Sequence, residues 1–273
     1  MKKLFSACLF IAITTSLAAQ SYEEFVEKSS DYIEKKDYIS AEQALKEALR
    51  KDPANQANTL LLANLGTVQR NLGKNDEALM SYTAALSNSP KSTSILHSRA
   101  SLYCETDDYD DAIKDYNTIL LIDDKDIEAY YNRALLHMSK NDLPAAKEDF
   151  FKITEIAPEN ALGKMGEALI YKTQNEWIKA ETAYSDLISK YRNNANLYFN
   201  RAECYVNLNR NNKAIDDLNK AQELGFEDAS LFIMRGQIRL AQYDKISAKL
   251  DFTKAKELGA KTAFIDKLIK KCE

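Results

Sequence analysis

Residues 99–116, RASLYCETDDYDDAIKDY, and residues 201–218, RAECYVNLNRNNKAIDDL, share a pattern that recurs along the chain. In both stretches an Arg precedes an Ala, a second Ala follows twelve residues later, and a bulky apolar residue comes four residues after that. Four residues make about one helical turn, so the second Ala and the bulky residue lie on one helix face. The pattern therefore predicts pairs of helices that approach closely at small residues.

The pattern occurs seven times, with a first step of 37 residues and later steps of 34. The second Ala of each copy is Ala41, Ala78, Ala112, Ala146, Ala180, Ala214 or Ala248. The small residue twelve positions earlier is Ser29, Gly66, Ala100, Ala134, Ala168, Ala202 or Gly236. Three copies close with a helix-ending proline, Pro53, Pro90 or Pro158. A fixed period of this length is typical of repeat proteins, in which each copy buries its apolar face against its neighbours.

The period and residue pattern resemble the tetratricopeptide repeat, a helix-turn-helix unit of 34 residues. The resemblance implies an all-α, right-handed superhelical solenoid of seven repeats. Four copies depart from the family pattern, since Asp124, Arg192, Phe226 and Ala260 stand where the closing proline is expected. The amphipathic stretch 262–272 predicts a capping helix, so we expect a solenoid over residues 20–260 and a cap over residues 261–273.

The first nineteen residues have the layout of a secretory signal peptide. Lys2 and Lys3 precede the apolar run 4–13, which is shorter than the roughly 20 residues that a membrane span requires, and small residues end at Ala19. We expect cleavage near Ala19 and export to the periplasm or the medium, without a membrane span. A lipoprotein signal is the alternative, but Cys8 stands at the start of the apolar run, where a lipidated Cys would close it.

The charge of the chain argues against nucleic-acid binding, and its cysteines do not indicate a metal or redox site. The formal charge of −4 falls to about −6 once the two lysines of the leader are removed, and no clustered basic face argues for nucleic-acid binding. Three cysteines remain, Cys104, Cys204 and Cys272, without a C-x-x-C spacing. An odd number leaves at least one unpaired, and we expect all three to be buried as small apolar side chains.

Four repeats carry an Arg before the small residue and an Asp sixteen residues later. The pairs are Arg99 with Asp115, Arg133 with Asp149, Arg201 with Asp217 and Arg235 with Asp251. Repeat five has neither member, showing Glu167 and Ala183, and the first two repeats lack both as well. Joint presence and joint absence predict structural ion pairs across packed helices, because a partly buried Arg without its acid is costly.

No motif in the sequence points to catalysis, a cofactor or a metal. His97 and His137 have no metal-ligand spacing, and neither a phosphate-binding loop nor a nucleophile elbow is present. The acidic stretch 105–128 lacks the spacing and central Gly of a calcium loop, and its Asp residues fall at predicted helix starts. Trp177 occupies the position of Tyr38 and Tyr109 at the start of a second helix, so we expect it to pack between helices and not to bind a ligand. We therefore expect a protein that is not an enzyme.

In similar proteins the first helix of each repeat lines a concave groove through its fifth, ninth and twelfth positions. From repeat four onward these positions are largely apolar, and we call eight of their apolar members the groove positions. They are Tyr131, Leu135, Met138, Met165, Leu169, Phe199, Val206 and Ile233. Asn64, Asn132 and Asn200 match part of a carboxylate clamp, but its basic members are absent.

An apolar strip on a surface usually marks a partner-binding site, whereas in a tight superhelix the same side chains would pack on neighbouring helices. We favour an adaptor that binds a peptide or protein segment. The alternative is a self-associating scaffold, in which the strip or an unpaired end receives another copy of the chain.

Overall fold

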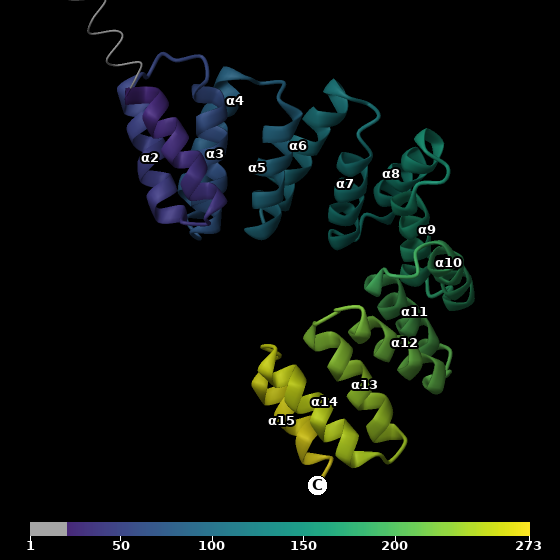
Figure 1. Cartoon of the computed structure of the whole chain (residues 1–273). Helices are drawn as coiled ribbons and strands as arrows, with labels where there is room; N and C mark the ends of the chain where they lie inside the picture. The colour runs from purple at the N-terminus through teal and green to yellow at the C-terminus, as the bar shows by residue number, and fades with distance from the viewer. Residues whose placement is uncertain (1–20) are drawn as a thin grey trace, which may run out of the picture. The chain divides into compact units, whose positions relative to one another are not determined.

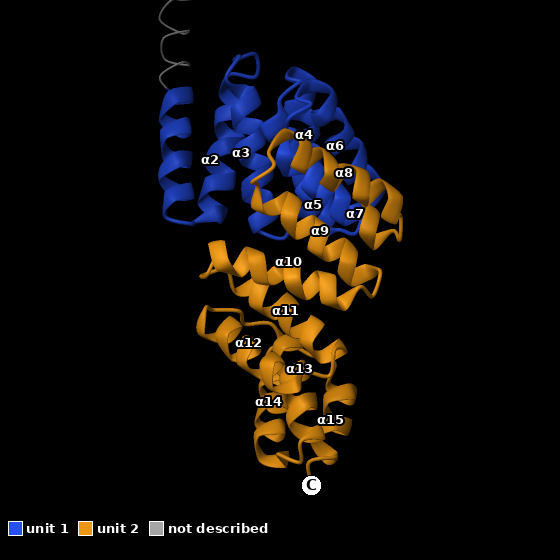
Figure 2. Cartoon of the chain, turned by 90° about the vertical axis from the view of Figure 1, so that its right-hand side faces the viewer, with its two compact units in different colours: residues 1–136 blue, residues 137–273 orange. Residues whose placement is uncertain are grey.

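The computed structural model describes residues 21–273, and every regular element in this part of the chain is a helix. The expected signal peptide lies outside the described residues. The chain divides into two compact units, residues 1–136 and 137–273, and the division falls inside the helix α7 (Ile127–Ser139) (Figure 2). The prediction of an all-α stack of helical hairpins is confirmed in both units (Figure 1).

The first unit contains three complete hairpins and most of a seventh helix. Its helical segments are residues 21–34, α2 (Tyr38–Lys51), α3 (Asn58–Asn71), α4 (Asn75–Asn88), α5 (Thr93–Glu105), α6 (Tyr109–Ile122) and α7 (Ile127–Ser139). The helices α2, α4 and α8 (Leu143–Ile156) each end two residues before Pro53, Pro90 or Pro158, because the residue before a proline is disfavoured in the α conformation.

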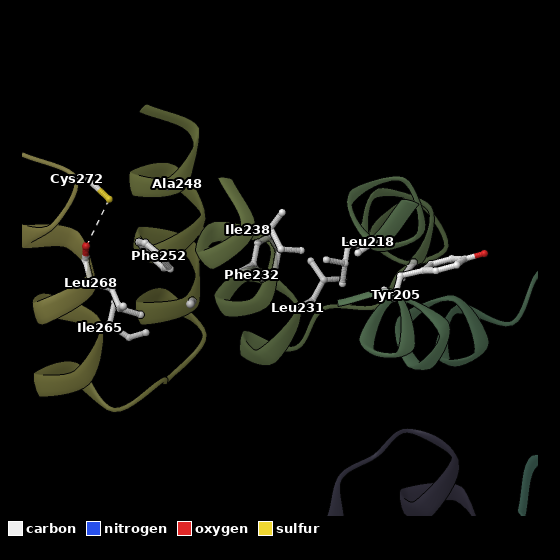
Figure 3. Packing of buried hydrophobic residues seen from close by; sticks show 14 residues of the cluster. Tyr205, Leu218, Leu231, Phe232, Ile238, Ala248, Phe252, Ile265, Leu268 and Cys272 are labelled. Carbon is white, nitrogen blue, oxygen red and sulfur yellow. Dashed lines mark hydrogen bonds between the residues drawn. The ribbon is translucent and has the colours of Figure 1, made fainter. Parts of the chain in front are cut away.

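The second unit begins with α8 and ends with a short terminal helix. Its helices are α8 (Leu143–Ile156), α9 (Ala161–Thr173), α10 (Trp177–Lys190), α11 (Ala195–Asn207), α12 (Asn211–Glu223), α13 (Ala229–Ala241), α14 (Lys245–Glu257) and α15 (Thr262–Lys270). The helix α15 packs against α14 through Ile265 and Leu268, so the expected capping segment is helical and covers the last hairpin (Figure 3).

The seven repeated Ala residues form the centre of the packing. Each of them is fully buried, as are the small residues twelve positions before them. At Gly236 an added Cβ would lie 2.6 Å from the ring of Phe252, and at Gly66 it would lie 2.8 Å from the ring of Tyr82. A small residue is therefore needed where a ring from the second helix of the hairpin lies against the first.

Every hairpin turn contains one residue in the left-handed backbone conformation, at the same position of the repeat. These residues are Lys36, Gly73, Asp107, Asn141, Asn175, Asn209 and Tyr243, with φ between 56° and 73°. Their spacing is again 37 residues once and 34 thereafter. A left-handed residue lets the chain reverse within a very short loop, so the repeat includes a fixed backbone conformation as well as a pattern of side chains.

Candidate functional site

The groove positions of the second unit are all half-buried. Met165 and Leu169 lie on α9, Phe199 and Val206 on α11, and Ile233 on α13. Met165, Phe199 and Ile233 follow one another at intervals of 34 residues, so they have the same phase in three successive first helices. In the α7 helix, Tyr131, Leu135 and Met138 are half-buried as well. None of these side chains is enclosed by the chain.

The same side chains also contact the core. Phe199 stacks on Phe226 with ring centroids 4.5 Å apart, and both rings pack against the buried cluster around Leu231 and Phe252. Val206 and Ile233 contact this cluster too. The residues thus have one side in the core and another accessible to solvent, which combines the two alternatives that the sequence leaves open.

The polar groups that interrupt the strip in the second unit are paired with one another. The Lys172 ammonium on α9 donates to the Glu203 carboxylate at 2.5 Å and to the Asn200 side-chain oxygen at 2.8 Å, both on α11. Lys172 is largely buried in this arrangement. Since the charges neutralise each other, the strip beside Phe199 presents little net charge to a partner.

In the first unit a hollow of about 290 Å³ lies between α5, α6 and α7. Its walls include His97, Cys104, Tyr116 and the groove position Leu135. The His97 Nε2 atom lies 2.8 Å from an Asp126 carboxylate oxygen, and the other Asp126 oxygen accepts from the backbone N–H of Ala129. This Asp therefore orients the histidine and also stabilises the start of α7.

Cys104 and Cys204 are poorly suited to nucleophilic attack. Cys104, Cys204 and Cys272 are all free, and the last two are buried. Burial raises the pKa of the Cys204 thiol to about 12 and raises the pKa of Cys104 as well. A thiol with a raised pKa carries almost no thiolate at neutral pH. Among residues 21–273 no group of His, Cys, Asp and Glu is arranged to hold a metal ion.

Three of the predicted Arg and Asp pairs meet within a single unit. The Arg99 guanidinium donates to both Asp115 oxygens at 2.8 and 2.7 Å, and Arg201 donates to both Asp217 oxygens at 2.7 and 2.8 Å. Arg235 donates to Asp251, which also accepts from Arg239 at 2.8 Å. These two-pronged contacts are the geometry that Arg favours with a carboxylate.

The fourth predicted pair falls on both sides of the division between the units. Arg133 belongs to the first unit, where it donates to the side chain of Asn117. Asp149 belongs to the second unit, where it is buried on α8.

Sequence reasoning did not find a hollow of the second unit that has a volume of about 460 Å³ and lies between α8 and α9. Phe150, Phe151, Glu167 and Tyr171 are among its walls, and no groove position is. A signal for it was present in the sequence, because repeat five is the later repeat that lacks the Arg and Asp pair.

The fold and the repeated turn define a class of proteins built from stacked helical hairpins. Two family profiles described as tetratricopeptide repeat match the chain, one over residues 63–127 and the other over residues 127–160 and 195–224. The crystal structure of a tetratricopeptide repeat protein from Parabacteroides merdae is 42% identical in sequence. The alignment covers 93% of this chain and 99% of that one, with a TM-score of 0.82. The chain belongs to the tetratricopeptide repeat family.

More distant structures share the fold alone. The structure of the APC/C hetero-tetramer Cut9-Hcn1 aligns with a TM-score of 0.70 at 14% identity, covering 91% of this chain and 55% of that one. PilW, described as a widely conserved type IV pilus biogenesis factor, aligns with a TM-score of 0.64 at 16% identity, covering 79% of this chain and 100% of its own. No curated protein sequence matches the chain significantly.

The family is one of protein-interaction modules, so its repeats indicate a protein that binds other proteins. Among the described residues, none of the helices is long and apolar enough to cross a membrane.

Proposed function

We propose that the chain is a non-enzymatic adaptor that binds an apolar peptide segment along the first helices of its later repeats. The observation that supports this function most directly is the row of Met165, Phe199 and Ile233, which are half-buried at the same phase of α9, α11 and α13. A partner laid across these helices would cover the solvent-accessible side of each residue.

The chemistry of the row fits a peptide with apolar side chains. Met and aromatic residues adapt their shape to a partner and supply much of the binding energy in protein interfaces. The neighbouring charges of Lys172 and Glu203 are already paired, so binding an apolar segment does not leave an isolated charge without a partner.

We also propose that the protein acts outside the cytoplasm. This proposal rests on residues 1–19 alone, with their two lysines, apolar run and small residues before Gln20. Expression of the whole chain in a bacterial host, followed by N-terminal sequencing, tests it. A mature chain that begins at or near Gln20 in the periplasmic fraction supports export, and a full-length chain in the cytoplasm contradicts it.

The groove proposal is tested with peptides selected from a random library by the mature protein. We expect the Met165→Ala/Ile233→Ala variant to bind the selected peptides at least about tenfold more weakly, because truncating central anchors of an interface costs over about 1 kcal/mol each. The Ile178→Ala variant removes a mostly exposed apolar side chain from α10 and serves as the matched control. Equal affinities of both variants would exclude the row as the binding site.

A self-associating scaffold is the second candidate, and exposed apolar side chains near the C-terminal end favour it. Ile246 and Leu250 lie four residues apart on α14 and are 80% and 67% exposed. Four residues are one turn, so the two side chains form one patch. Light scattering over a hundredfold range of concentration distinguishes the candidates, since a constant monomer mass rejects the scaffold.

A further inference from the structure

The hollow between α8 and α9 lies where the other later repeats place a ring and a guanidinium of their own. In repeat six, the Arg201 guanidinium lies 5.8 Å from the centre of the Tyr198 ring and donates to Ser185 on the preceding helix. In repeat seven, Arg235 lies 5.4 Å from the Phe232 ring and donates to Asn219 on the preceding helix. The ring, the Arg and the polar acceptor thus form a recurring set.

Repeat five replaces every member of this set. Lys164 stands in place of the ring, Glu167 in place of the Arg, Phe151 in place of the polar acceptor and Ala183 in place of the paired Asp. The substitutions remove a large ring and a guanidinium from the contact between the two helices. The volume of about 460 Å³ is what they leave open.

The walls of the hollow are largely apolar and aromatic. Phe151 is 64% exposed, although the corresponding positions of the neighbouring repeats hold Asn117 and Ser185. Pro158, Ile170 and Tyr171 complete the apolar lining. The ring of Phe150 on α8 lies against Gly166 on α9, where an added Cβ would lie 2.1 Å from the ring. This contact keeps the two helices close together on one side of the hollow.

Among the charged residues that line the hollow, Glu167 has a carboxylate that is available to pair with a partner. Glu167 is exposed, and in the described part of the chain its carboxylate accepts a hydrogen bond from the Tyr171 hydroxyl at 3.0 Å but forms no ion pair. Lys164 is paired with Glu159 at 3.0 Å, and Glu159 also binds Lys190 at 2.7 Å. Lys147, an exposed lysine on α8, is the other charged residue in the lining.

We propose that this hollow, which we call the α8–α9 socket, binds a partner segment that inserts an aromatic side chain and a neighbouring arginine. The inserted ring lies against Phe151 and Pro158, as Tyr198 fills the corresponding place in repeat six. The inserted guanidinium pairs with the Glu167 carboxylate and contacts the Tyr171 ring. A planar guanidinium over a ring and beside a carboxylate is a favourable arrangement that repeats three and six already use.

The socket is separate from the groove positions. None of the groove positions lines the socket, whose walls on and just after α9 are Gly163, Lys164, Glu167, Ile170, Tyr171 and Gln174. With about 100° between successive helix residues, Glu167 and Leu169 point about 160° apart. Binding at one site therefore leaves the other site accessible.

The test uses the mature protein labelled with ¹⁵N and the hexapeptide acetyl-Gly-Tyr-Ala-Ala-Arg-Gly-amide, which carries Tyr and Arg at the spacing of Tyr198 and Arg201. We expect saturable shifts of the amide signals of Phe151, Gly163, Glu167 and Tyr171. A peptide with citrulline in place of Arg keeps the shape and removes the charge, and we expect it to bind about five- to tenfold more weakly. Equal binding of both peptides, or shifts confined to other helices, would refute the socket.

Variants of the protein separate the socket from the groove. Glu167→Gln should reduce the affinity for the Arg peptide about fivefold and leave the affinity for the citrulline peptide unchanged. Met165→Ala, on the other face of α9, should change neither. A Lys147→Ala variant should bind the Arg peptide slightly more tightly, since it removes a like charge.

A variant whose own side chains fill the socket provides the most decisive test. The quadruple variant Phe151→Ser/Lys164→Tyr/Glu167→Arg/Ala183→Asp restores the set of repeat six and should lose measurable binding of the Arg peptide while melting at a higher temperature. Retained binding by this folded variant would show that the peptide does not occupy the socket. By contrast, weaker binding of the library-selected peptides by the Met165→Ala/Ile233→Ala variant supports the groove proposal and does not test the socket.

Discussion

The first two repeats and the last two solve the same packing problem with different polar groups. In repeat seven, Arg235 and Asp251 form a buried pair, and Arg239 joins it. Repeat two has Leu65 and Ser81 at those positions. In the first two repeats the Ser81 hydroxyl donates to the Gln69 side chain at 2.6 Å, and the buried Glu42 carboxylate accepts from Lys46 and Lys74, both at 2.7 Å.

The difference shows that repeats with the same period can have different buried polar residues. The C-terminal arrangement uses arginines, which stay charged at all accessible pH values and hold one carboxylate from two sides. The N-terminal arrangement uses half-exposed lysines around one buried carboxylate. The two regions should therefore respond differently to mutation.

The largest effect is expected from removing the shared carboxylate of the C-terminal arrangement. Asp251→Ala leaves Arg235 and Arg239 without their acid, and we expect the free energy of unfolding to fall by about 3 to 5 kcal/mol. Urea denaturation measures it. The double variant Arg235→Met/Asp251→Leu replaces the pair by apolar groups and should recover most of the loss, whereas an equal loss in both variants would contradict a buried ion pair.

A smaller and pH-dependent effect is expected at Glu42. Burial alone raises the pKa of Glu42, but hydrogen bonds from Lys46, Lys74 and Gln69 outweigh burial and lower the pKa from 4.5 to about 2. A lowered pKa in the folded state stabilises the protein above the ordinary pKa. This contribution, about 2 kcal/mol after allowance for solvent screening, is lost as the pH falls from about 4.5 to about 2.

The comparison of wild type with Glu42→Gln isolates this contribution. Denaturation at pH 7, 4 and 3 should show a stability difference that is greatest at pH 7 and shrinks toward pH 3. A Glu42→Gln difference that is constant with pH would contradict the lowered pKa.

The close contacts at glycine are expected to give an intermediate effect in both regions. In Gly236→Ala the new methyl group meets the fully buried ring of Phe252, and in Gly66→Ala it meets the buried ring of Tyr82. We expect each variant to lose about 1 to 2 kcal/mol, because overpacking costs more than the roughly 1 kcal/mol that Ala gains over Gly in a helix. Thermal melting measures the loss. An increase in melting temperature in either variant would show that the rings can move.

The smallest effect is a gain at the last hairpin turn. Tyr243 has φ of 66° and is 90% exposed, while Asn209 occupies the same turn position in the preceding repeat with φ of 56°. We expect Tyr243→Asn to raise stability by about 0.5 to 1 kcal/mol, because Asn tolerates the left-handed conformation better than Tyr. The reverse change, Asn209→Tyr, should cost a similar amount, and no change in either variant would argue against a left-handed turn.

The helices and their order could be predicted from the sequence because the repeated Ala residues mark every hairpin. The left-handed turn was not predicted, since Lys, Gly, Asp, Asn and Tyr all occupy it and no residue type identifies it. The groove positions were placed by resemblance, and their half-buried state depends on tertiary packing such as the stacking of Phe199 on Phe226. In the sequence, the α8–α9 socket was indicated only by the presence of Glu167 and Ala183 where other repeats have Arg and Asp. Such replacements reveal a cavity only once the positions of the neighbouring helices are known.

The recurring turn has a consequence for how the length of the protein can change. Removal of residues 209–242 would join α11 to the turn at Tyr243 in the same phase, and Arg201 would then face Asp251 instead of Asp217. The junction keeps the backbone conformation, the ion pair and the terminal helix α15 together. A chain built in this way can therefore gain or lose 34 residues at a time by recombination and still consist of whole hairpins, whereas a cut at another phase would leave half a hairpin unmatched.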